Sequence, residues 1–204
     1  MNRFNDFSGL GEDFNTFKEE DVNLKETGTC DSSGVKATYE WYNSIIVAVS
    51  IVVIMLTFFF RLVNVDGTSM QQTLQDKDRV LVSNLFFTPK SGDVIIISHG
   101  EVYDKPLVKR VIATEGQSLK IDFQEQVVMV DGIVIDEPYK YTAMSEGGAN
   151  IPTVIPKGKI FVMGDHREVS MDSRHKDIGL IDAENVLGKV YYVMFPFDHF
   201  KKVY

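Results

Sequence analysis

Cysteine is almost absent from this sequence of 204 residues, and Cys30 is the only one. A single cysteine excludes an internal disulfide and any metal site built from several cysteines. The four histidines show no HExxH or similar spacing, so we expect neither a metal ion nor another cofactor. The net charge of −8 argues against nucleic acid as a partner, because proteins that bind nucleic acid carry a basic surface.

Acidic residues are concentrated at the start of the chain. Residues 1–40 hold nine acidic and four basic residues, whereas the remaining chain holds 20 acidic and 17 basic ones. The same forty residues are rich in Asn, Ser, Gly and Thr, a composition that does not support a packed core. We therefore predict a disordered acidic tail over residues 1–40.

Charge is missing altogether from residues 41–60, between Glu40 and Arg61. Twenty helical residues span about 30 Å, which is the thickness of the hydrocarbon core of a bilayer. Aromatic residues stand at both ends, where interfacial side chains belong. One alternative is a buried core helix, which we disfavour because the stretch is apolar all round. The other is a cleaved signal peptide, which would start near the N-terminus, have a shorter apolar core and end in a small-x-small site. We therefore predict one transmembrane anchor over residues 41–62, whose orientation the flanking basic residues do not decide.

After the anchor, the sequence changes to alternating apolar and polar residues with many β-branched side chains, a pattern typical of strands. Turns rich in Gly, Pro and Ser separate the expected strands. These strands are 80–87, 93–98, 107–114, 118–123, 127–130, 133–135, 159–163 and 186–194. We therefore expect a mostly β fold, with one antiparallel β-sheet domain over residues 63–204.

Ser69 lies in a polar turn, residues 67–74, soon after the anchor. Taken by itself it is an ordinary turn serine, because a serine nucleophile also needs a base. No histidine stands nearby in a recognisable motif, so a Ser-His-Asp triad has no support in the sequence.

Lys109 and Arg110 lie in the expected strand 107–114, where neighbouring side chains point to opposite faces of the sheet. Both charges therefore fall in apolar rows. Arginine keeps its charge and needs a partner, whereas burial lowers the pKa of a lysine and favours its neutral form. To serve as a base near neutral pH, the Lys109 pKa must fall by roughly 3 from about 10.4. The alternative is a lysine whose ammonium group reaches water beside the sheet.

A third segment, residues 161–174, adds a dense set of short polar and charged side chains to the end of an apolar strand. Its candidates for ion pairs and short hydrogen bonds are Asp165, Arg167, Ser170, Asp172, Ser173 and Arg174. The pattern leaves two interpretations open, a buried polar network and a solvated charged loop.

Together these segments resemble the type I signal peptidases, which are membrane-bound serine peptidases with a Ser/Lys dyad. The resemblance covers residues 44–197 and rests on four sequence blocks in order behind a membrane span. The blocks are Ser69-Met70-Gln71-Gln72-Thr73-Leu74, Gly92-Asp93-Val94-Ile95, Lys109-Arg110-Val111-Ile112, and Gly164-Asp165-His166-Arg167 followed by Ser170-Met171-Asp172-Ser173-Arg174.

The resemblance implies the chemical roles. Ser69 would attack the scissile carbonyl, and neutral Lys109 would take the proton of its hydroxyl. Ser170 would donate to or accept from Lys109 and orient it. The backbone N–H of Ser69 would serve the oxyanion hole, because Gly67 stands where some members carry a helping serine.

Supporting residues are also implied by the resemblance. Arg110 would pair with Asp165, and Asp172 with Arg174, so that the loop carrying Ser170 is held in place. The residues expected at the substrate-binding, membrane-facing rim are Met70, Phe86 and Phe87.

Substrate and location follow from the same resemblance. Members of this family bind an extended segment at a sheet edge, with small pockets for the residues at −1 and −3. Preproteins with a signal peptide and a small-x-small cleavage site would therefore be the substrates. The other partner would be the bilayer of the plasma membrane, near the export machinery. The tail would lie in the cytoplasm and residues 63–204 on the outer face.

Two departures from the family pattern lie close to the expected site. Gln72 stands in place of a proline, and His166 in place of an asparagine. They raise the possibility of a specialised paralogue. One alternative is a non-catalytic relative that assembles surface fibres, against which Ser69 and Lys109 argue. A self-cleaving repressor domain is the other, against which the membrane span and the acidic tail argue.

Overall fold

The computed structural model describes residues 32–98 and 105–204. Most of the predicted disordered tail lies outside these residues. Contacts along the chain separate two units, with the boundary between Ala48 and Val49, and we describe the helix and the β domain separately.

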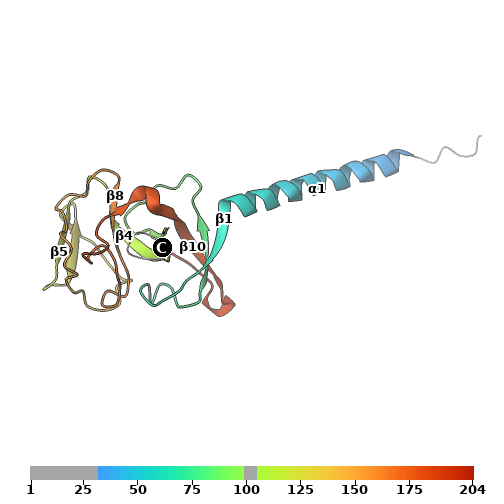
Figure 1. Ribbon diagram of the computed structural model, residues 1–204. Helices are drawn as coiled ribbons and strands as arrows, with labels where there is room; N and C mark the ends of the chain where they lie inside the picture. Colours follow the sequence, from blue (N-terminus) through green and yellow to red (C-terminus); the bar gives the residue numbers. More distant parts are fainter. Residues whose placement is uncertain (1–31, 99–104) are drawn as a thin grey trace, which may run out of the picture. The chain divides into compact units, whose positions relative to one another are not determined.

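Helix α1 (Ser32–Phe59) contains the uncharged stretch except its last residue, Phe60, and Figure 1 shows α1 as one continuous helix. It begins within the predicted tail. Its segment Thr38–Phe59 is long and apolar enough to cross a membrane, and none of it is buried within the described residues. The helix ends before the predicted anchor does, because strand β1 (Phe60–Asn64) follows at once and finds backbone partners in residues 79–83.

The remaining chain forms antiparallel strands. After β1, they are β2 (Arg79–Ser83), β3 (Val94–Ile97), β4 (Leu107–Ala113), β5 (Leu119–Asp122), β6 (Val127–Val130), β7 (Ile133–Val134), β8 (Lys159–Met163), β9 (Ile181–Asp182), β10 (Val186–Phe195) and β11 (Lys201–Lys202). Two short 3-10 helices, Ala183–Asn185 and Phe197–His199, flank β10. The large sheet has the order β1-β2-β10-β3-β4-β8-β9, with β11 paired to β10, and a second sheet has the order β5-β6-β7.

The predicted mostly β, antiparallel fold is confirmed. Strands β6 and β8 have the predicted bounds, whereas the predicted strand 80–87 stops at Ser83. The backbone of Phe86 has a φ of 50°, which no extended strand can accommodate. Strands β9 and β11 were not predicted, because a strand of two residues is too short to show an alternation of apolar and polar side chains.

Apolar packing fixes two elements that matter for the site. Met70 and Leu74, from the turn that carries Ser69, are buried in one cluster with residues of β2, β3 and β10. Strand β4 lies between β3 and β8 in the large sheet, and its residue Val108 packs against the same cluster. The turn and β4 therefore rest on a common packed core.

Candidate active site

The Ser69 turn is held by its own backbone and by its apolar side chains. The N–H of Gln71 donates to the Thr68 carbonyl at 3.0 Å, and that of Leu74 to the Met70 carbonyl at 2.8 Å. Because Met70 and Leu74 are buried on the inner side of the turn, Ser69 is left half-buried between core and solvent. Its backbone N–H has no hydrogen-bond partner among the described residues.

Lys109 meets Ser69 directly. Its Nζ lies 2.8 Å from Ser69 Oγ and 3.1 Å from the Val108 carbonyl oxygen. Only 3% of Lys109 is exposed, so the alternative of an ammonium group that reaches water is wrong. Burial lowers the pKa of Lys109 from 10.5 to about 8. The nearby carboxylates of Asp172 and Asp165 favour the ammonium form and limit this fall.

Ser170 does not make the predicted bond to Lys109. Its hydroxyl oxygen is buried and has no hydrogen-bond partner among the described residues, and the Lys109 nitrogen donates instead to Ser69 Oγ and to the Val108 carbonyl. Ser170 instead packs against Gly164. A Cβ atom on Gly164 would lie 2.2 Å from Ser170 Oγ and 2.5 Å from the Ser69 carbonyl oxygen. Ser170 thus lies beside the Ser69 turn. Only a glycine fits at position 164, between Ser170 and this turn.

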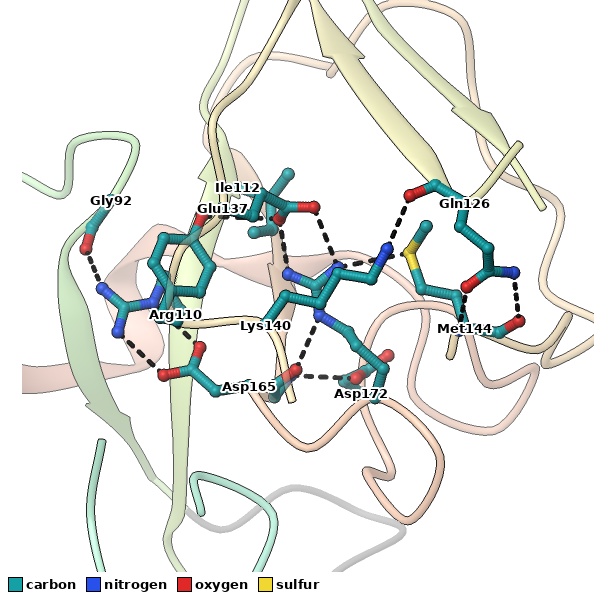
Figure 2. A network of polar contacts seen from close by, with 12 residues as sticks. Gly92, Arg110, Ile112, Gln126, Glu137, Lys140, Met144, Asp165 and Asp172 are labelled. Carbon is teal, nitrogen blue, oxygen red and sulfur yellow. Dashed lines mark hydrogen bonds and ion pairs between the residues drawn. The ribbon is translucent and has the colours of Figure 1, made fainter. Parts of the chain in front are cut away.

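The predicted pair of Arg110 and Asp165 is present (Figure 2). The guanidinium Nε and Nη2 donate to the two carboxylate oxygens at 2.9 and 2.8 Å, and both side chains are almost fully buried. Thr73 Oγ1 donates to the same carboxylate at 2.5 Å, and the Tyr139 ring lies 3.8 Å from the guanidinium carbon. Sequence reasoning missed Thr73 and Tyr139. The pair therefore connects β4, the nucleophile turn and the loop after β8.

The charged side chains of Asp165, Arg167, Asp172 and Arg174 form a buried polar network, so the alternative of a solvated charged loop is wrong for them. Asp172 accepts two hydrogen bonds from the Arg174 guanidinium, at 2.9 and 2.8 Å, one from the Arg174 backbone N–H at 3.2 Å and one from the Gly164 N–H at 3.0 Å. Arg167 forms a buried ion pair with Glu137, which the sequence analysis did not identify. Figure 2 shows Glu137 and Asp172 within one continuous set of polar contacts.

The backbone of His166 forms a hydrogen bond to the Ser69 turn. Its N–H donates to the Ser69 carbonyl at 3.0 Å, and its ring Nδ1 lies 3.3 Å from the Thr68 carbonyl oxygen. The Tyr141 ring meets the His166 ring edge to face, with 4.9 Å between centroids. The exchange of asparagine for histidine therefore leaves a residue that contacts the turn.

The expected rim residues differ from one another. Met70 is 1% exposed and lies in the core, so its place at the rim is wrong: it packs on the inner side of the turn with Val65 and Leu74. Phe86 is 98% exposed, and Phe87 is half-buried against the cluster around Ile95.

These groups suit nucleophilic attack at a carbonyl. A half-buried hydroxyl, a buried lysine with a lowered pKa and a backbone N–H without a partner among the described residues are the kinds of group that a nucleophile, a base and an oxyanion donor require. Across residues 32–98 and 105–204, no three His, Cys, Asp or Glu side chains gather as a metal site requires.

Comparison with known proteins gives the family. Residues 38–195 match the family model described as signal peptidase, peptidase S26. A signal peptidase I of Bacillus licheniformis is 35% identical over 175 residues, covering 80% of this chain and 92% of that protein. A signal peptidase IB of Staphylococcus aureus (strain Mu50) is 36% identical over 186 residues, covering 81% and 94%.

A crystal structure of a signal peptidase I from Enterococcus faecalis aligns with 50% of this chain and 97% of that chain. The identity is 20% and the TM-score 0.42, so this overlap carries no conclusion. The family model spans most of the chain, and the sequence relatives agree with it. This protein therefore belongs to the signal peptidase family, the S26 peptidases.

Proposed function

We propose that this protein removes signal peptides from preproteins with Ser69 as nucleophile and Lys109 as general base. Family membership makes it a signal-peptide-cleaving serine peptidase. The observation that carries the residue assignment is the 2.8 Å contact between Lys109 Nζ and Ser69 Oγ. A base must lie within hydrogen-bond reach of the proton that it takes, and this lysine does.

The reaction runs in two halves. Lys109 takes the hydroxyl proton as Ser69 Oγ attacks the scissile carbonyl, and the new oxyanion accepts a hydrogen bond from the Ser69 N–H. Lys109 then gives the proton to the leaving amine, and the C–N bond breaks. The signal peptide remains bound to Ser69 as an ester. Lys109 next takes a proton from water as the water oxygen attacks the ester carbonyl. The bond between this carbonyl carbon and Ser69 Oγ then breaks, and Lys109 returns the proton to Oγ, which frees the signal peptide with a terminal carboxyl group and restores the dyad.

An open sheet edge beside Lys109 supports binding of an extended substrate. Strand β8 pairs with β4 only from Arg110 onward, whereas β3 pairs with β4 from Leu107. Residues 107–109 therefore have a strand on one side alone among the described residues. A peptide that adds to this edge gains backbone hydrogen bonds next to Ser69. Small residues at −1 and −3 let its backbone approach.

Helix α1 supports a membrane anchor. We assign Thr38–Phe59 to the bilayer, residues 1–37 to the cytoplasm, and residues 60–204 to the outer face of the plasma membrane. Phe86, which is almost fully exposed, would lie at the membrane-facing rim. This arrangement places the dyad where a preprotein emerges from the export machinery.

The test is cleavage of a preprotein by the purified full-length protein in detergent. Ser69→Ala and Lys109→Met are compared with wild type and with Ser145→Ala, an exposed serine remote from the dyad in sequence. We expect wild type and Ser145→Ala to cut after a small-x-small site, and the two dyad variants to be inactive. Failure of folded wild type to cut several preproteins would instead favour the non-catalytic assembly factor.

A further inference from the structure

An open pocket of about 500 Å³ lies beside the nucleophile and is unused by the mechanism above. Every residue that lines it can form hydrogen bonds through its side chain. The lining residues are Thr68, Gln71, Gln72, Gln75, Asp76 and Tyr141. Each lining side chain thus offers a hydrogen-bond partner to a polar group in the pocket.

The glutamines of the pocket are available to a ligand. The carboxamides of Gln71, Gln72 and Gln75 make no side-chain hydrogen bond to any described residue. Asp76 Oδ1 accepts from the Gly67 N–H at 2.8 Å and lies 3.7 Å from Lys77 Nζ, and the other oxygen of Asp76 is free among the described residues. A carboxamide both donates and accepts, whereas a carboxylate only accepts. The pocket therefore favours amide or cationic groups over carboxylates and hydrocarbon.

The position of the pocket separates it from the part of the substrate that precedes the cut. That part lies along the open edge at residues 107–109, and the pocket takes no residue from β4. Its volume also exceeds what the small residues at −1 and −3 require. We therefore match the pocket with the part of the substrate that follows the scissile bond.

Gln72 gives the pocket a feature that the usual family sequence lacks. A proline at this position offers no side-chain hydrogen bond, whereas Gln72 offers a carboxamide. Its backbone has a φ of 66°, and Lys201 Nζ donates to its carbonyl at 3.1 Å. The turn thus holds Gln72 in a conformation that proline cannot adopt.

We infer that this pocket selects the first two residues of the released chain, at +1 and +2, and that it prefers glutamine or lysine there to leucine or glutamate. The inference rests on the proposed function. It makes Gln71 and Gln75 specificity-determining residues, since both project from the turn that carries Ser69.

The test uses peptides with one cleavage site and identical residues through −1. Positions +1 and +2 are Gln-Gln, Lys-Lys, Leu-Leu or Glu-Glu, and kcat/KM is measured for each with full-length protein in detergent. One or two hydrogen bonds correspond to about a fivefold preference for Gln-Gln over Leu-Leu in wild type. The double variant Gln71→Leu/Gln75→Leu should reduce this ratio to about 1.

The ratio within one enzyme does not depend on how much of a variant is folded. Gln124→Leu makes the same exchange at an exposed position in the turn between β5 and β6, and should keep the wild-type ratio. Equal cleavage of all four peptides by wild type, or a double variant with the wild-type ratio, would overturn the inference alone. If wild type cut none of them, the proposed function would fail as well.

Discussion

Lys109 Nζ lies 2.8 Å from Ser69 Oγ, at the place where β4 has no β8 partner. Two properties that the proposed reaction needs thus come from one position in the sheet. Burial in the row of β4 favours the neutral form of the base, and the open edge beside it admits an extended chain.

The pH dependence of cleavage should report the Lys109 pKa. Since we propose the neutral amine as the base, kcat/KM should rise with pH and level off above about 8, the pKa to which burial lowers this lysine. The profile is measured between about pH 6 and 10 on a peptide without ionisable side chains. Lys159→Met, at an exposed ion pair, should leave the inflection in place. An inflection near 10 would contradict a buried neutral base.

Replacing Lys109 should stabilise the fold while it abolishes cleavage. The folded pKa of about 8 is below the unfolded value of 10.5, so the unfolded state binds more protons between these pH values. The lysine therefore lowers the free energy of unfolding most below pH 8, and this cost disappears as the pH rises through 10.5. Lys109→Met should raise that free energy at pH 7 by up to about 3 kcal/mol.

Thermal melts of both proteins in detergent at pH 7 and pH 10 test the prediction. The midpoint of Lys109→Met should exceed that of wild type at pH 7, and the gap should narrow at pH 10. A variant that melts below wild type at both pH values would show that the lysine contributes more to packing than its charge costs.

The buried pair of Arg110 and Asp165 should matter far more for stability than any exposed pair. Arg110→Met leaves the carboxylate buried without its cation, which costs about 3–5 kcal/mol of unfolding free energy. Lys159→Met at the exposed pair with Asp182 should cost less than about 1 kcal/mol. Denaturant unfolding in detergent compares the two. Equal losses would contradict the assignment of Arg110 to the support of the site.

Contacts between residues of the four sequence blocks were the ones that could be predicted. Lys109 and Arg110 stand in apolar rows of a strand, so the period of the strand predicts their burial. The burial of Arg110 in turn requires a partner, which the family pattern supplies as Asp165. The observed pair joins residues that are 55 positions apart.

Other contacts depend on packing between distant segments, which no local pattern encodes. Tyr139 lies in an irregular segment, yet its ring stacks on Arg110. Glu137 lies in the same irregular segment, and its ion-pair partner, Arg167, lies in the distant loop after β8. Met70 looks like a surface residue in a polar turn, but the turn places it on the inner side. Such details are decided by how the turn meets the sheet.

Gly164 should tolerate no side chain. Alanine would bring a Cβ to 2.5 Å from the Ser69 carbonyl oxygen and 2.2 Å from Ser170 Oγ, so the nucleophile turn has to move. A displacement of about 1 Å at a reacting atom can cost about a hundredfold in rate. We expect Gly164→Ala to lose most of its kcat. Removing the hydroxyl as well, in Gly164→Ala/Ser170→Ala, should restore only part, because the clash with the backbone oxygen remains.

The turn at Gln72 gives the last prediction, since φ at this residue is 66°. Proline is held near −65°, so Gln72→Pro restores the usual family residue in a backbone that it cannot fit. Glycine adopts positive φ freely, and Gln72→Gly should keep the turn. We expect the proline variant to lose kcat on an Ala-Ala substrate at +1 and +2, while the glycine variant keeps more of it. A proline variant as active as wild type would show that the turn can change to the family conformation without displacing Ser69.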